Sequence, residues 1–314
     1  MITWNESKTV SGYGRSLTGQ RTTVFGPNPS HLRGKMTSME NILTDFTDTA
    51  SVKVSIKENW KNYHYFLGRA PSVELSIGRY LTWLVTNMPD HFMNLVICTE
   101  MPQEGIETLV KEALDHFKSL NIKKLSWLAE AGIPAQEIKK HLLANGLTFR
   151  ESYAAEMAID LTAMSADRPL PDGLEIRLVE DDTSLRQWIH VASVGFGVPV
   201  EMEEIWFEFF NNAACRTPFQ TYLGLVDGKP GATSQLCNSA GVAGIYNVTC
   251  LPEARKRGIG SALVLSPLLA ARKTGMKIGV LQSSSMGYNA YRRLGFQDFG
   301  QLSVYLWNQN EVSR

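Results

Sequence analysis

The residues best suited to chemistry lie between Arg255 and Gly260, where three basic side chains precede a Gly-Ile-Gly sequence. An apolar, β-branched run comes before them, and a helical pattern follows from Ser261 to about Lys273. The first amides of a helix have no partner within the helix, and the helix dipole adds partial positive charge there. Glycines let an anion approach the backbone closely. The pattern predicts an anion site between a strand and a helix.

The loop alone leaves another interpretation open, because a helix start whose glycines only relieve packing has the same sequence. Two common phosphate loops are excluded. There is no Gly-Lys-Ser/Thr ending for a nucleoside triphosphate, and there is no third glycine or acidic ribose partner for a dinucleotide.

A second motif follows the helix. An apolar strand at Lys277–Leu281, the serines 283–285 and a short helix lead to Tyr291-Arg-Arg-Leu-Gly-Phe296. Arg255-x-x-Gly258-x-Gly260, followed by this Tyr-x-x-x-Gly-Phe sequence, resembles the GNAT family of acetyl-CoA-dependent N-acyltransferases. The resemblance is strong over residues 174–308 and weak elsewhere. It implies a mixed α/β fold and acetyl-CoA as co-substrate.

The resemblance also implies roles for individual residues. The strand before the loop would pair with the pantetheine arm, and one of its amides would face the thioester oxygen; Val248, Thr249 and Cys250 match this strand end. The pyrophosphate would be held by backbone amides and cationic side chains of the loop, which are Arg255, Lys256, Arg257, Gly258, Ile259, Gly260 and Ser261.

Two further positions match the family's motif around the CoA sulfur. Tyr291 stands where the family places a tyrosine that gives a proton to the thiolate leaving group, for which a phenol is suited. Ser284 stands seven residues earlier, where many members carry an asparagine that bonds the pantetheine. A helix N-cap is an equally good interpretation of Ser284.

The general base cannot be read from the sequence. The strand GIYNVTC carries no carboxylate, so Tyr246 and Asn247 are its polar candidates. Glu201, Glu203 and Glu204 lie near the substrate side, although a solvated helix face explains them more simply. We expect Cys250 to serve packing, because no histidine is paired with it in the sequence.

Composition limits the function classes. The chain of 314 residues is 44% hydrophobic, and its 31 basic residues balance 31 acidic ones, so we expect neither a nucleic-acid nor a membrane partner. No apolar run approaches the ~20 residues of a membrane span. The cysteines (Cys98, Cys215, Cys237 and Cys250) form no CxxC pair, which favours a reducing, cytoplasmic location and no metal site.

The chain divides into segments of different character. Residues 1–35 are Gly-, Ser- and Pro-rich and are expected to be a disordered leader, or to precede a true start at Met36. Residues 36–162 form a first domain and 163–173, with Pro169 and Pro171, a linker. Residues 174–314 form the catalytic domain.

Periodicity predicts the elements within these domains. In the first we expect an amphipathic start at 42–50, an aromatic stretch at 60–66, a further segment at 80–85, strands at 93–98, 124–128 and 152–161, and helices at 104–120 and 134–143. In the second we expect strands at 174–178, 221–226, 231–237 and 243–250 and a helix at 183–194, with an Asp227-Gly228 hairpin turn.

The two domains have corresponding sequence patterns, which indicates an internal repeat. Gly105-Ile106-Glu107 falls where Gly258-Ile259-Gly260 falls, and Gly146 falls where Gly295 falls. The first copy has an acidic loop, and Leu142 stands in place of the tyrosine. We therefore interpret residues 36–162 as a degenerate GNAT-like domain that binds no cofactor.

The sequence predicts an N-acetyltransferase that passes the acetyl group of acetyl-CoA directly to a primary amine of a small molecule or peptide, as a monomer or homodimer. A non-catalytic acyl-CoA-binding module and an acyl or aminoacyl transferase of the tandem GNAT kind remain alternatives. The missing strand carboxylate favours the first alternative. The lack of a basic groove for a large anionic donor speaks against the second.

Overall fold

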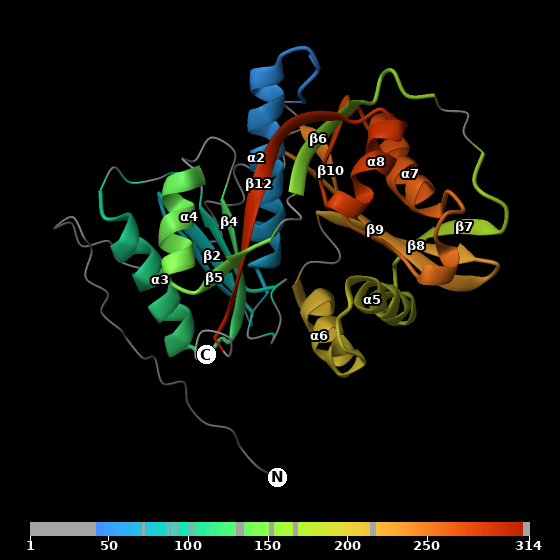
Figure 1. The fold of residues 1–314 in the computed structure, drawn as a ribbon. Helices are drawn as coiled ribbons and strands as arrows, with labels where there is room; N and C mark the ends of the chain where they lie inside the picture. Colours follow the sequence, from blue (N-terminus) through green and yellow to red (C-terminus); the bar gives the residue numbers. More distant parts are fainter. Residues whose placement is uncertain are drawn as a thin grey trace, which may run out of the picture.

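The computed structural model describes residues 42–70, 73–86, 88, 91, 93–98, 100, 102, 104–129, 135–150, 154–165, 169–213 and 218–309. Within these residues the strands form one mixed sheet in the order β1-β2-β3-β4-β12-β6-β11-β10-β9-β8-β7, with β5 beside β12. The two halves lie side by side, and helix α2 stands between them (Figure 1). The expected leader at 1–35 and the alternative start at Met36 lie outside the described residues.

The second half has the predicted elements in the predicted order, together with an α-helix at Glu203–Ala213 that was not predicted. It comprises β7 (Leu174–Leu178), α5 (Asp182–Phe196), α6 (Glu203–Ala213), β8 (Phe219–Val226), β9 (Lys229–Ser239), β10 (Val242–Cys250), α7 (Ile259–Lys273), β11 (Ile278–Ser283) and α8 (Ser285–Leu294). The predicted hairpin turn is confirmed, because Asp227 and Gly228 both take positive φ, 51° and 78°.

The first half contains α2 (Thr49–Leu67), β1 (Glu74–Ile77), β2 (Leu81–Val85), β3 (Leu95–Cys98), α3 (Ile106–Ser119), β4 (Lys124–Ala129), α4 (Ala135–Ala144) and β5 (Leu147–Phe149). The predicted amphipathic start at 42–50 is wrong, since the helix begins only at Thr49 and then runs through the aromatic stretch. Trp60, Tyr63 and Phe66 recur every three residues on this helix, and all three are buried. The short strands β1 and β5 were not predicted.

The last strands of the two halves are exchanged. β6 (Ala154–Asp160) follows the first half in the chain, yet it pairs with β11 from Ile278↔Asp160 to Ser283↔Ala155. β12 (Gln297–Asn308) pairs with β6 through its first residues and with β4 from Ser303↔Ala129 to Asn308↔Lys124. β12 therefore runs from one half into the other through the middle of the molecule (Figure 1). The predicted linker at residues 163–173 therefore does not divide the sheet into two separate parts.

Helix α2 connects the halves through its side chains. Its first turns pack Val52 and Ile56 against Ala158 and Val280 of the second half's sheet. Its last turns place Tyr63 and Phe66 in one cluster with residues of α5, such as Trp188. Because α7 packs with Ile245 and Leu281 in a separate cluster, α2 and α7 cover opposite faces of that sheet.

The backbone supports the internal repeat. Gly105 caps α3 with φ of 80°, and Gly258 caps α7 with φ of 79°. Gly146 and Gly295 follow α4 and α8 and also take positive φ, 81° and 104°. A left-handed residue at each of these helix ends suits glycine because glycine has no Cβ.

Candidate functional site

The strands β10 and β11 separate where the motifs meet. Their parallel pairing consists of Ala243↔Gly279 and Gly244↔Val280, and no pairing of the two strands follows in the described chain. β10 continues to Cys250 on β9 alone. One edge of residues 245–250 is therefore open, and this edge includes the predicted Val248, Thr249 and Cys250.

A bulge fixes the backbone of β10 within this opening. The pairing with β9 shifts between Tyr246 and Thr249, and Asn247 takes φ of 50°. The hydroxyl of Thr233 donates to the Asn247 carbonyl at 2.8 Å, and the Asn247 amide donates to the Tyr63 hydroxyl at 2.9 Å. Side chains of the neighbouring strand and of α2 thus hold the bulge.

The basic loop ends beside this strand. Among the described residues, the backbone amides of Gly258, Ile259, Gly260 and Ser261 donate to no backbone carbonyl, whereas that of Ala262 donates to Gly258 at 3.0 Å. A Cβ at Gly260 would lie 3.3 Å from the sulfur of Cys250, so glycine allows α7 to start close to the end of β10. Four free amides at a helix start fit an anionic group such as a pyrophosphate.

The cations of the loop differ in their surroundings. Arg255 donates from Nε to the carbonyl of Cys250 at 3.0 Å, and its side chain therefore stays beside the end of β10. Arg257 forms an ion pair with Asp227 at 3.2 Å and contacts the Asp172 carbonyl, which ties it to the β8–β9 turn. Lys256 is exposed and takes φ of 60°.

Tyr291 lies on α8 close to Cys250. Burial, with a smaller contribution from the neighbouring Cys250, raises the pKa of Tyr291 to about 12. Burial also raises the pKa of Cys250 to about 11, although Arg255 acts in the opposite direction. Both groups are therefore protonated at neutral pH, so Tyr291 can donate a proton and Cys250 is a poor nucleophile.

Of the remaining sequence candidates, Glu201 is exposed, and Ser284, Glu203 and Glu204 have structural partners. Ser284 is the N-cap of α8 and accepts from the amide of Gly287 at 3.4 Å. Glu204 pairs with Arg186, and Glu203 contacts His190 and Ser193, so these carboxylates link α5 to α6.

The two polar candidates for a base on β10 are also engaged. Tyr246 donates to Asn59 at 2.6 Å, and its ring stacks on Tyr63 with centroids 3.9 Å apart. Burial raises the pKa of Tyr246 well above its usual value. Asn247 donates to Tyr63 and Gln235. Neither side chain is placed to take a proton from an amine.

Polar residues from distant segments lie on α2 and on the strands beside β10 and β11, and the sequence did not single them out. They are Asn59 and Tyr63 on α2, Gln235 on β9, Glu156 on β6 and Gln282 on β11. Asn59 and Tyr63 have a helical i, i+4 spacing, and Glu156 interrupts the apolar strand AAEMAID. A carboxylate within an apolar strand is the local signal that would have drawn attention to Glu156.

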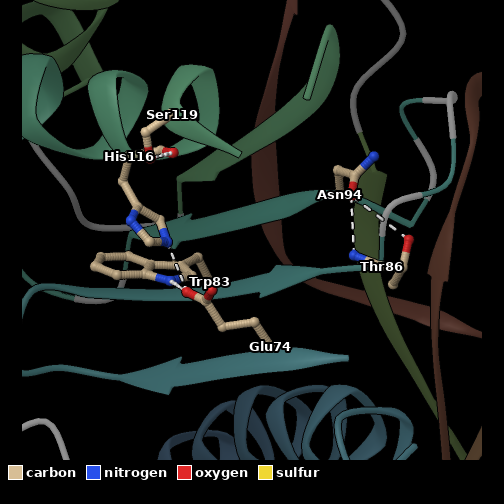
Figure 2. A network of polar contacts seen from close by, with 6 residues as sticks. All are labelled: Glu74, Trp83, Thr86, Asn94, His116 and Ser119. Carbon is tan, nitrogen blue, oxygen red and sulfur yellow. Dashed lines mark hydrogen bonds and ion pairs between the residues drawn. The ribbon is translucent and has the colours of Figure 1, made fainter. Parts of the chain in front are cut away.

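A second polar cluster lies in the first half. His116 Nε2 lies 2.6 Å from Glu74 Oε1, and Trp83 Nε1 donates to the same oxygen at 3.0 Å (Figure 2). The contact with His116 lowers the pKa of Glu74, burial opposes this, and Trp83 adds to the lowering. The cluster ties β1 and β2 to α3 and contains none of the predicted site residues.

A cavity of about 190 Å³ lies between Ile159, Leu265 and Gly295, and its lining includes none of the predicted site residues. No helix in the described part of the chain is long and apolar enough to cross a membrane.

Comparison with known proteins identifies the fold. No family model and no curated protein matches the sequence. Among solved structures, a GCN5-related N-acetyltransferase from Kribbella flavida matches with a TM-score of 0.60 and 16% identity, over 81% of this chain and 95% of that one. A GCN5-related N-acetyltransferase from Sphaerobacter thermophilus matches with a TM-score of 0.55 and 16% identity, over 75% and 82%.

The two-half arrangement also has a match. A tandem GNAT protein from the clavulanic acid biosynthesis pathway matches with a TM-score of 0.54 and 12% identity, over 85% of this chain and 97% of that one. The chain has the mixed α/β fold of the GNAT acetyltransferases, in a tandem arrangement, as its motifs predicted.

Proposed function

We propose that the chain is an N-acyltransferase that takes an acetyl group from acetyl-CoA and transfers it to a primary amine of a small molecule or peptide. One observation carries this proposal: the open edge of β10 beyond Gly244 ends beside the free amides of Gly258–Ser261. An open strand edge can pair with the amides of a pantetheine arm, and the helix start can hold the pyrophosphate.

The residues of the second half have distinct tasks in this reaction. Acetyl-CoA supplies the activated acyl group. The loop from Arg255 to Ser261 binds its phosphates, and an amide of Val248, Thr249 or Cys250 polarises the thioester carbonyl. Tyr291, protonated at neutral pH, donates a proton to the departing thiolate. The GNAT acetyltransferases with this fold support acyl transfer as the reaction class.

A non-catalytic acyl-CoA-binding module is the second candidate. It is favoured by one observation: Tyr246 and Asn247, the two polar candidates for a base on β10, are both engaged by α2 and β9. Such a module would bind acetyl-CoA at the same place and release no thiol.

Two measurements on the full chain separate these candidates. Calorimetry with acetyl-CoA should find one site per chain; two sites would show that the first half binds CoA as well. Release of free CoA, followed with a thiol reagent in the presence of a diamine, an amino sugar or a peptide, should then depend on the amine. Binding without amine-dependent release would establish the binding module, and absence of binding would refute both candidates.

A further inference from the structure

The bulge at Asn247 adds one residue to β10. The pairing with β9 runs through Tyr246↔Gln235 and resumes at Thr249↔Thr233. Two residues of β10 therefore lie opposite one residue of β9, and such an extra residue re-aims the part of the strand that follows it. That part is the open edge of β10, because the pairing with β11 has already ended.

The bulge changes which way the following residues point. Tyr246 and Asn247 are consecutive, yet both bond residues of α2. Val248 and Cys250, which come next, pack with the cluster around α7 on the other face of the sheet. A shift of one residue turns every following side chain over, and backbone amides alternate in the same way between the two neighbours of a strand. The bulge therefore decides which amide of residues 248–250 points to the open edge, where the thioester oxygen would lie.

The conformation of Asn247 is imposed by its surroundings. Its φ of 50° lies in the left-handed region, which a residue with a side chain keeps only where neighbouring groups hold it. The hydroxyl of Thr233 donates to its carbonyl at 2.8 Å. Its side-chain amide donates to the hydroxyl of Tyr63 at 2.9 Å and to Oε1 of Gln235 at 3.1 Å. These contacts hold both the backbone and the side chain of the bulge.

Tyr63 brings the first half of the chain into this arrangement. It lies on α2, and only 6% of it is exposed. Its ring stacks on Tyr246 with centroids 3.9 Å apart and meets Phe219 edge-on at 5.3 Å. Packing on two sides therefore fixes the place of its hydroxyl beside Asn247.

We propose that Tyr63 is a positioning residue for acyl transfer: through Asn247, its hydroxyl holds the bulge in the conformation that aims a β10 amide at the thioester oxygen. This inference rests on the proposed function and adds a task for the first half. Helix α2 completes the acyl-transfer site of the second half without itself contacting acetyl-CoA.

Infrared spectroscopy tests the aim of the amide directly. Acetyl-CoA labelled with carbon-13 at the carbonyl should show a lower stretching frequency when bound to the wild-type chain, because a hydrogen bond to the thioester oxygen weakens the C=O bond. Tyr63→Phe keeps the stacked ring and removes the hydroxyl, so most of this shift should be lost. Tyr222→Phe is the matched control. It removes a hydroxyl that bonds Gln220 on the α7 face of the sheet, and the band should stay at its wild-type position.

Kinetics on the same variants separates positioning from binding. Tyr63→Phe should lower kcat at least about tenfold, because a misplaced group loses catalysis steeply, and should leave the calorimetric Kd for acetyl-CoA unchanged. Tyr222→Phe should change neither quantity. Asn247→Gly removes the link to Tyr63 at a position where glycine accepts positive φ, and it should lower kcat by a similar factor. Because Tyr63 acts through Asn247, the double variant should lose no more kcat than either single variant.

The outcomes that overturn the inference differ from those that refute the function. A full carbonyl shift in Tyr63→Phe, or losses of kcat that multiply in the double variant, would overturn the positioning role. A wild-type chain that binds acetyl-CoA and leaves the carbonyl band at its free position would do the same. A wild-type chain that does not bind acetyl-CoA, or that binds it without amine-dependent release of CoA, would instead refute the proposed function itself.

Discussion

The hydroxyl of Tyr246 donates a hydrogen bond of 2.6 Å to Oδ1 of Asn59, which lies 187 positions earlier in the chain. The amide nitrogen of Asn59 in turn lies within hydrogen-bond distance of the carbonyls of Cys237, Ser239 and Val242. A Cβ at Gly244 would lie 2.0 Å from Asn59 Oδ1, so this close approach requires glycine. One side chain of the first half therefore holds both strands, β9 and β10, that lead to the proposed thioester site.

The first prediction concerns this residue. Asn59→Ala leaves the Tyr246 hydroxyl and several carbonyls without their partner in a buried place, and each unpaired group costs about 1–3 kcal/mol. The free energy of unfolding, measured in urea, should fall by at least about 3 kcal/mol. Asn289→Ala, at an exposed position of α8, is the control and should change it by less than about 0.5 kcal/mol. Equal effects of the two variants would contradict the bridging role.

The second prediction concerns the anion site. Ser261→Glu places a carboxylate beside the free amides, where it should repel a pyrophosphate and weaken acetyl-CoA binding about tenfold or more. The same carboxylate at a helix start should preserve stability or add about 0.3–1 kcal/mol. Ser261→Gln has nearly the same size without the charge, and its Kd should stay close to wild type. The measurement is calorimetry, and equal Kd values for the two variants would place the phosphates elsewhere.

The third prediction concerns Tyr291. Tyr291→Phe should lower kcat by about 10²-fold or more, because general acid catalysis typically contributes that much. The Kd for acetyl-CoA should change little. Burial holds the pKa of Tyr291 at about 12, so its ionisation should cause no loss of wild-type activity below pH 10. Tyr288→Phe on the same helix removes a hydroxyl that bonds Asp298 and is the matched control. A decrease of similar size in both variants would assign Tyr291 to packing.

The fourth prediction follows from the exchanged strands. Residues 169–314 alone lack β6, which fills the position between β11 and β12. This fragment and residues 42–165 should each fail to fold when expressed separately, because each leaves long strand edges unpaired. Expressed together, they should form a stable one-to-one complex, detectable by co-purification and size-exclusion chromatography. A folded, monomeric fragment of residues 169–314 would show that the exchange is dispensable.

The fifth prediction concerns pH. In the folded state the pKa of Glu74 is lowered, chiefly by its hydrogen bond with His116. The ionised carboxylate therefore stabilises the fold at pH values above the ordinary glutamate pKa. This contribution is lost as the pH falls through the lowered pKa. Glu74→Gln should therefore lower the melting temperature at pH 7 and have less effect at about pH 3. Glu58→Gln, whose carboxylate pairs with Lys61 on an exposed helix face, is the control. If Glu74→Gln lowered the melting temperature by the same amount at both pH values, ionisation of Glu74 would be excluded as the cause.

Local patterns were enough to predict most elements of the second half. The Asp227-Gly228 turn and the glycine before α7 are short-range signals, because each needs a backbone conformation that few residues adopt. The pairing of the strands at the centre was not predictable in this way. No local pattern within 297–308 tells that Ser303 and the residues after it pair with β4.

The same limit applies to the site. The loop from Arg255 to Ser261 and Tyr291 were predicted from motifs in one stretch of chain that resemble those of the GNAT family, and their roles stay predictions. Glu156 and Gln282 are 126 positions apart in the sequence and meet only through the exchanged strand. The contacts of Asn59 and Tyr63 with β10 likewise depend on how α2 crosses the sheet, which no local pattern encodes.

The exchange of β6 and β12 also constrains how such a chain can change over generations. Two independent copies of a fold can be lost one at a time, as often happens after a gene is duplicated. Once each copy holds an internal strand of the other, deleting either copy removes a strand from the middle of the remaining sheet. A duplication with such an exchange becomes irreversible, and each half is retained because its neighbour's sheet is incomplete without it.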